Sequence, residues 1–130
     1  MKHLSLLTVV LVTVATLVHA TTLDQPSGQA MRAAAFLDEY AKNEIAADAK
    51  FRDKVIALGG AVDRIGVDQE VGVPYVILSS GMWEVKCIFP RSAAGKIATL
   101  KPKSLVSITG TVAGKRSETS QVILLQDCRI

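Results

Sequence analysis

Residues 54–68 read KVIALGGAVDRIGVD, a long apolar-rich stretch with Gly59-Gly60 in its middle. Glycine inside a strand often marks a bulge or a sharp bend. The first strand of a small closed barrel has to bend, because it pairs on both sides of the barrel. We therefore expect one long strand over 54–68, with its bend at Gly59-Gly60.

Four shorter stretches with strand character follow, separated by residues that favour turns, such as Gly72, Pro74 and Ser80-Gly81. The expected strands are 75–79, 84–89, 105–113 and 121–130, and residues 92–100 are expected to form a short helix. Five short strands with a helix between the third and the fourth are the pattern of an OB-fold barrel. We predict a mainly β protein with this architecture and an additional N-terminal helix.

That N-terminal helix is predicted over residues 28–51, after Ser27 as its N-cap. At 100° per residue its apolar side chains form one stripe. The members of the stripe are Ala33, Phe36, Leu37, Tyr40, Ala47 and Phe51. Glu44 falls inside the stripe, and a buried carboxylate is costly unless it is paired or hydrogen-bonded. We expect Glu44 to be buried and to tie the helix to the barrel; a ligand contact at the barrel mouth is the alternative, and a catalytic acid is disfavoured.

The first twenty residues have the features of a secretory signal peptide. Lys2 gives a positive start, an uncharged run follows, and Val18-His19-Ala20 is a small-residue cleavage pattern. The apolar run is shorter than the roughly 20 residues that a membrane-spanning helix needs. We expect residues 1–20 to be removed, residues 21–27 to be a loose lead-in, and residues 28–130 to form one OB-fold domain. No membrane span is expected after cleavage, no lipidation cysteine follows the cleavage point, and the location is expected to be periplasmic or secreted.

Composition excludes several classes of chemistry. Both histidines, His3 and His19, lie in the signal segment, so the expected mature chain has none. Histidine-based catalytic triads and histidine-based metal sites are therefore excluded. The mature chain keeps 14 Lys and Arg against 12 Asp and Glu, which gives a net charge of only +2. We predict no metal, no cofactor and no enzymatic activity.

The two cysteines, Cys87 and Cys128, are too far apart in sequence to form a CxxC motif. In an OB-fold the third and fifth strands are neighbours, and Cys87 lies in the third while Cys128 lies near the end of the fifth. An even number of cysteines in an exported chain favours a disulfide. We predict a bridge between them, although Cys128 faces inward with Leu125 only if the last strand contains a bulge; two buried thiols are the alternative.

Several segments together resemble a known family, the secreted tRNA-anti-like OB-fold proteins. The similar segments are Tyr40 with Asn43-Glu44 and Ala47-Asp48, then Lys54 to Gly59, Pro74-Tyr75-Val76, Val85 to Phe89, Leu105 to Gly110 and Leu125 to Ile130. Asp53 stands where the family usually has glycine, and many members carry a lipidation cysteine that is absent here. The resemblance implies the fold and little about activity. Asn43, Glu44 and Asp48 are expected to have structural roles.

Two groups of residues are candidates for ligand binding. OB-folds bind oligonucleotides on the second and third strands and on the adjoining loops. Tyr75 and Trp83 are candidates for a stacking pair there, and Lys115 and Arg116 are expected in the loop between the last two strands. The loop after the first strand is acidic, through Asp63, Asp68 and Glu70, and would repel a phosphate backbone. For both groups, ordinary surface or core residues are the alternative.

We therefore predict a non-enzymatic binding module of the cell envelope whose partner is a protein or a small envelope component. Single-stranded nucleic-acid binding is the alternative, which the fold favours and the charge and compartment disfavour. The sequence specifies no oligomeric state.

Overall fold

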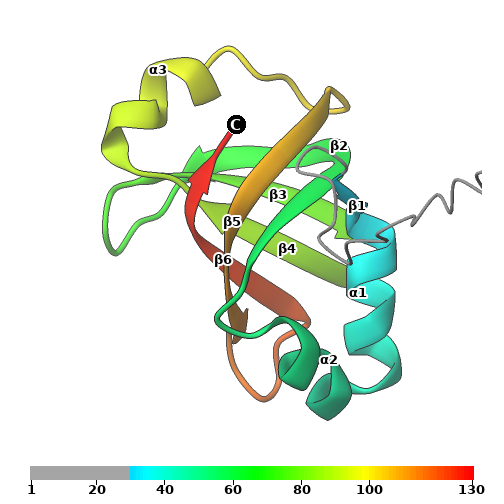
Figure 1. The fold of residues 1–130 in the computed structure, drawn as a ribbon. Coiled ribbons are helices and arrows are strands. Elements are labelled where there is room, and N and C mark those ends of the chain that lie inside the picture. Colours follow the sequence, from blue (N-terminus) through cyan, green and yellow to red (C-terminus); the bar gives the residue numbers. More distant parts are fainter. Residues whose placement is uncertain (1–29) are drawn as a thin grey trace, which may run out of the picture.

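The fold is an OB-fold barrel preceded by two helices, and Figure 1 shows their arrangement. The structure, a computed structural model, describes residues 30–130; the predicted signal peptide and lead-in lie outside the described residues. The elements are β1 (Met31–Arg32), α1 (Ala33–Lys42), α2 (Glu44–Phe51), β2 (Val55–Val67), β3 (Pro74–Ser80), β4 (Trp83–Ile88), a 3₁₀ turn (Arg91–Ala93), α3 (Ala94–Ile97), β5 (Leu105–Lys115) and β6 (Val122–Arg129).

Five strands close the barrel in the order β2-β3-β4-β6-β5, and β5 pairs back onto β2. The β4–β6 pair is parallel, and the other barrel pairs are antiparallel. The long strand β2 serves both sides, because residues 55–61 pair with β5 and the remainder pairs with β3. The predicted fold class, including a short helix between the third and fourth barrel strands, is confirmed.

The irregularity in β2 lies beyond the two glycines where a bend was expected. The register with β3 shifts between Val62 and Arg64, which marks a bulge at that point. The glycines serve a close approach instead: a Cβ on Gly60 would stand 3.3 Å from the Cβ of Ala33. Gly60 therefore allows the start of α1 to pack directly on β2.

Alternation along the strands fills the barrel. Val76 and Leu78 of β3 and Val85 and Cys87 of β4 point into the barrel and are buried, whereas Ile77 and Lys86 between them belong to the outer face, although they too are largely covered. Burial of each large apolar side chain contributes about 1.5–3 kcal/mol. α3 buries Ile97 against the barrel and lies far from α2, on the opposite side of the barrel (Figure 1).

Three aromatic rings connect the N-terminal helices to the core. Phe36 packs edge-on against Tyr40 and against Phe51, with ring centroids 5.3 Å and 5.0 Å apart. All three rings are buried. The expectation that this part of the apolar stripe faces the core is therefore confirmed.

The prediction of one continuous helix over 28–51 is wrong. The chain is extended at Asn43, with φ −159° and ψ 100°, so α1 ends there and α2 begins. The Asn43 side chain accepts a hydrogen bond from the N–H of Ala46 at 3.0 Å, which caps α2. Upstream, residues 31–32 form the short strand β1, parallel to β2, and not helix.

Candidate binding surfaces

The outer face of β3 and β4 is the surface that OB-folds commonly use for ligands. We call it the β3–β4 face; it consists of Arg64, Tyr75, Ile77, Ser79, Glu84 and Lys86. Neighbouring strands hold these residues in register: Arg64 opposite Ile77, Ile77 opposite Lys86, and Ser79 opposite Glu84. The predicted site residue Tyr75 belongs to this face.

Lys86 is central to the β3–β4 face, although it is only 8% exposed. Its Nζ donates to Asp68 Oδ2 at 2.8 Å and lies 4.5 Å from the centroid of the Tyr75 ring. Asp68 also accepts the N–H groups of Glu70 and Val71 through Oδ1. The hydrogen bond from Lys86, followed by those from the backbone, lowers the pKa of the Asp68 carboxyl. Lys86 thereby anchors the β2–β3 loop.

The Tyr75 ring is covered on this face. A Cβ on Gly66 would stand only 2.5 Å from the Tyr75 hydroxyl oxygen, so the ring rests on the backbone of β2 at that glycine. The Lys86 ammonium approaches the ring from β4. Tyr75 is therefore a packed residue here and offers little free ring surface for stacking.

Tyr75 and Trp83 do not come together. Tyr75 is opposite Ile88, whereas Trp83 is opposite Ser80 beside the hairpin turn. At ~3.4 Å per residue these positions are roughly 17 Å apart along β3. Trp83 packs against the core, on the inner side of the sheet. The idea that the two aromatic residues form a stacking pair is therefore wrong.

The remaining charges of the β3–β4 face are also bound locally. Arg64 forms an ion pair with Glu84, at 2.5 Å between Nη2 and Oε1. The Ser79 hydroxyl donates to Asp63 Oδ2 at 3.0 Å, and the same carboxylate oxygen lies 3.5 Å from Arg64 Nε. Each cation of this face thus has a carboxylate of the same chain beside it.

Lys115 connects α2, Trp83 and the β5–β6 loop. Its Nζ donates to Glu44 Oε1 at 2.7 Å and to the carbonyl oxygen of Glu118 at 2.8 Å, and lies 5.9 Å from the Trp83 ring centroid. Arg116 is exposed, and it forms no ion pair among residues 30–130. The structure therefore brings Lys115 and Trp83 together and leaves Arg116 apart.

The expectation that Glu44 is buried is wrong, because its side chain is 49% exposed. The break at Asn43 rotates α2 away from the angular stripe that a single helix would have had. Glu44 still connects the helix to the barrel, through Lys115. Asp48 has the more buried partner: its Oδ1 accepts from the hydroxyl of Tyr40 at 2.9 Å, and its Oδ2 lies 3.2 Å from Arg52.

The two cysteines meet inside the barrel but are not bonded. They lie 4.4 Å apart as free, buried thiols. The predicted proximity is present, since β4 and β6 are neighbours, and the predicted bridge is not made in this structure. Asp127, with φ 52°, provides the bulge that turns Cys128 inward with Leu125. The neighbouring Cys128 thiol and burial raise the pKa of the Cys87 thiol.

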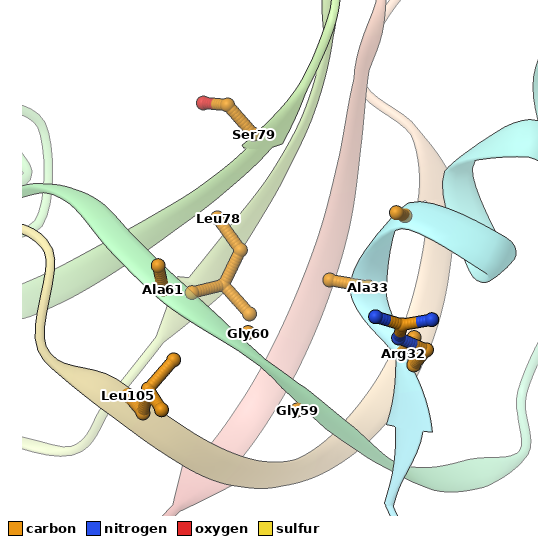
Figure 2. Close-up of a pocket in the computed structure, with 9 residues that line it drawn as sticks. Arg32, Ala33, Gly59, Gly60, Ala61, Leu78, Ser79 and Leu105 are labelled. Atoms are coloured by element: carbon orange, nitrogen blue, oxygen red, sulfur yellow. The ribbon is translucent and has the colours of Figure 1, made fainter.

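A cavity of about 400 Å³ opens where β1, α1, β2 and β3 meet (Figure 2). We call it the notch; among the residues that line it are Arg32, Ala33, Gly60, Ala61, Leu78, Ser79 and Leu105. In Figure 2 Leu78 and Ala33 extend into the space between β3 and α1, while Arg32 and Leu105 lie on its two sides. No sequence pattern marks this site, because the notch depends on where the pairing of β2 with its neighbouring strands stops.

Residues 30–130 contain no group of three or more His, Cys, Asp or Glu side chains arranged to hold a metal ion. No helix in the same part of the chain is both long and apolar enough to cross a membrane.

The barrel, the capping helices and the sequence agree with one family. The tRNA_anti-like family profile matches residues 3–129. The chain belongs to the tRNA_anti-like family. Among these residues, Asp53 adopts a left-handed conformation with φ 63°, which fits a position where the resemblance noted above has glycine. No curated protein matches the chain.

Solved structures support the fold of this tRNA_anti-like protein. One is a proposed nucleic-acid-binding lipoprotein from Klebsiella pneumoniae, with a TM-score of 0.61 and 17% identity, covering 77% of this chain and 90% of that one. Another is a proposed aspartyl-tRNA synthetase from Leishmania major, with a TM-score of 0.53 and 14% identity. That match covers 81% of this chain but only 20% of the synthetase. At these identities the likeness concerns the fold.

Proposed function

We propose that this chain is a non-enzymatic binding module of the cell envelope whose partner is a protein. The observation that carries the proposal is the internal neutralisation of the β3–β4 face. Arg64 is paired with Glu84, and Lys86 is paired with Asp68. A phosphate backbone binds by exchanging its counterions for free Lys and Arg side chains. Here those cations would first have to leave carboxylates of their own chain.

The aromatic residues support the same proposal. Proteins that bind single strands without sequence preference stack bases on exposed rings. On this face the one ring, that of Tyr75, rests on Gly66 and is approached by Lys86. Protein interfaces, in contrast, tolerate paired charges at their rim and need exposed apolar groups. Met82 next to Trp83, at 79% exposed, and Ile45 beside Glu44 are such groups.

Export to the envelope is supported by two observations. Residues 1–20 have the features of a signal peptide. The similar Klebsiella structure is described as a lipoprotein, a class of exported protein.

Single-stranded nucleic acid is the second candidate partner. The description of the Klebsiella structure as nucleic-acid-binding favours it. So do the basic residues on and around α3, namely Arg91, Lys96, Lys101 and Lys103. These lie beyond the β3–β4 face, so they would provide a non-specific electrostatic contact and not a stacking site.

Oligonucleotide binding at two salt concentrations separates the two candidates. Fluorescence anisotropy with labelled oligo-dT and oligo-U should show no saturable binding by the full chain at physiological salt. The double variant Asp68→Asn, Glu84→Gln should gain binding at low salt, because it removes the carboxylate paired with Lys86 and leaves Arg64 only the more distant Asp63. The control Asp53→Asn, Asp127→Asn changes the net charge equally, at two exposed acids that form no ion pair among residues 30–130, and should gain less.

Two results would contradict the proposal. One is tight binding by the wild type that weakens steeply with salt. The other is an equal gain for the two double variants, which would mean that net charge and not local pairing sets the affinity. Capture from envelope extract, with and without nuclease treatment, tests the protein partner directly: the captured partner should persist after nuclease.

A further inference from the structure

The wall of the barrel is open at the notch. On one edge of β2, pairing with β1 ends at Gly59 and pairing with β3 begins at Val62. Gly60 and Ala61 therefore have no strand partner on this edge, although β5 pairs with both on the other edge. Ser79, across the notch, is paired with β4 alone. Unpaired strand edges bind extended polypeptide backbones.

The floor and the lip of the notch are apolar. Ala33 and Leu78 are buried at its base. Leu105, which is opposite Ala61 in the β2–β5 ladder, stands at the lip and is 85% exposed. An exposed leucine beside an apolar floor offers a ready contact for an aliphatic side chain. The volume of about 400 Å³ is within the range of ~300–1,000 Å³ that small ligand sites occupy.

The outward positions of the β2–β5 ladder beside this lip carry no charge. The outward positions of β2 that pair with β5 are Val55, Ala57, Gly59 and Ala61, and their partners on β5 are Thr111, Thr109, Ser107 and Leu105. The β3–β4 face of the same barrel carries Arg64, Glu84 and Lys86 instead. A partner on the β2–β5 side therefore displaces no ion pair of this chain.

Arg32 gives the notch its single charge. Among residues 30–130 its guanidinium forms no ion pair. Asp63, which lies near the Ser79 side, is already bonded to Ser79 and close to Arg64. The charge that complements this site is consequently a carboxylate.

We propose that the notch binds an extended segment of another protein, which places an aliphatic side chain against Ala61 and Leu105 and a carboxylate against Arg32. The inference deepens the proposed function and rests on it. The backbone of the segment would pair with the N–H and C=O of Ala61, since residues 60 and 62 on either side direct theirs to β5 and the residues just before it. Apolar contact, backbone pairing and one charge pair are the three elements by which an extended peptide is recognised.

Amide chemical shifts of the isotope-labelled full chain test the proposal. The probes are acetylated, amidated pentapeptides of sequence Ala-Val-Leu-Glu-Ala and Ala-Val-Leu-Gln-Ala. We expect the Glu peptide to shift the amides of Gly60, Ala61 and Ser79 at millimolar concentration. The Gln peptide should bind about twofold to fivefold more weakly, which is the span that an exposed ion pair supports.

Variants locate the contacts. Arg32→Gln should remove the preference for the Glu peptide, whereas Arg116→Gln, at an exposed arginine elsewhere, should keep it. Leu105→Asn should weaken both peptides, whereas Val71→Asn, at an exposed apolar residue of the β2–β3 loop, should not. All four substituted positions are at the surface, so unchanged spectra away from the notch would show that the fold is intact.

Three results would overturn the notch proposal: no shift at the notch with either peptide, equal affinity for the two peptides, or an equal effect of the control variants. Peptide shifts on the β3–β4 face would reject the notch and leave the protein-binding function standing. Oligonucleotide binding with a steep salt dependence would instead reject that function.

Discussion

The sulfur of Cys128 fills the space beside Gly110, so that a Cβ on Gly110 would stand 2.6 Å from Cys128 Sγ. The two residues are on neighbouring strands, β5 and β6. The left-handed Asp127 turns Cys128 into the barrel at this point. Gly110 and the bulge at Asp127 therefore depend on each other: the bulge turns the Cys128 thiol inward, and the missing side chain of Gly110 leaves room for it.

Gly110→Ala should destabilise the fold by about 1–3 kcal/mol, the usual cost of overpacking a core. Urea unfolding measures the loss. Cys128→Ala in the same chain should recover part of it, because the clashing sulfur is gone. Gly95→Ala is the control, since a Cβ there meets no atom within 4 Å. An equal loss for the two glycine variants would contradict the packing explanation.

The thiols of Cys87 and Cys128 should be inert in the folded protein. Both are buried, and the neighbouring Cys128 thiol together with burial raises the pKa of Cys87, which keeps its reactive thiolate scarce. Iodoacetamide without reductant should label neither thiol in the native state and both after unfolding in urea. Intact mass gives the result. No label after unfolding, with a mass lower by two hydrogens, would show that the bridge predicted from the sequence does form.

Tyr40 should make stability fall at high pH. Its hydroxyl is buried, with the residue 1% exposed, and burial together with the hydrogen bond to Asp48 raises its pKa above the ordinary 10.0. Above pH 10 the unfolded chain releases this proton while the folded chain keeps it. The contribution of the protonated Tyr40 hydroxyl to the free energy of unfolding is thus complete below the pKa of tyrosine in the unfolded chain. It is lost as pH rises above that pKa, by up to about 1.4 kcal/mol per pH unit.

Tyr40→Phe separates this effect from the titration of lysines. At neutral pH the variant should be less stable by about 1 kcal/mol, because it lacks the hydrogen bond to Asp48. Urea unfolding at rising pH should show the gap between the two proteins closing above pH 10. A gap that stays constant would mean that Tyr40 ionises as easily in the folded protein as in the unfolded chain.

The strands were predictable from the sequence, whereas the contacts between distant side chains were not. Apolar residues at every second position, such as Val76 and Leu78, identify a strand and its inner face. Lys86 meets Asp68 and Lys115 meets Glu44 across separations of 18 and 71 residues. Such pairs depend on register and loop path, which alternation alone does not determine.

The helix break at Asn43 had a local signal that the apolar stripe concealed. Asparagine is a favoured N-cap residue, and Glu44 is an acidic residue in the first turn of α2. The alanines on both sides favour helix, so periodicity alone extended one helix through the cap. The notch had no comparable signal, because it arises where β1 stops and β3 has not yet begun.

Two acids of α2 should differ in their contribution to stability. Glu44 is half exposed, and its bond to Lys115 is a surface ion pair, so Glu44→Ala should cost less than about 1 kcal/mol. Asp48→Ala leaves the buried Tyr40 hydroxyl without its partner and should cost about 1–3 kcal/mol. Thermal or urea unfolding compares them, and a larger loss for Glu44→Ala would reverse the assignment.

Lys86 should control both the β2–β3 loop and the accessibility of Tyr75. In Lys86→Met the apolar stem is retained, but Asp68 loses its cation and the Tyr75 ring loses the ammonium near its face. The Asp68 carboxylate then accepts hydrogen bonds only from the backbone N–H groups of Glu70 and Val71 in its own loop. Hydrogen exchange at these two amides should accelerate severalfold, while exchange in β5 stays unchanged.

The lowered pKa of Asp68 should also move back toward its ordinary value in Lys86→Met, since the hydrogen bond from Lys86 is the largest cause of the lowering. As pH falls toward that value, the wild type should keep its loop protection longer than the variant. Lys96→Met, at a lysine that donates to the carbonyl oxygen of Ile130, is the matched control and should leave the loop unaffected. Equal exchange in the wild type and Lys86→Met would show that the loop is held by its own turn, and the charge pairing on the β3–β4 face would then have no role in ordering it.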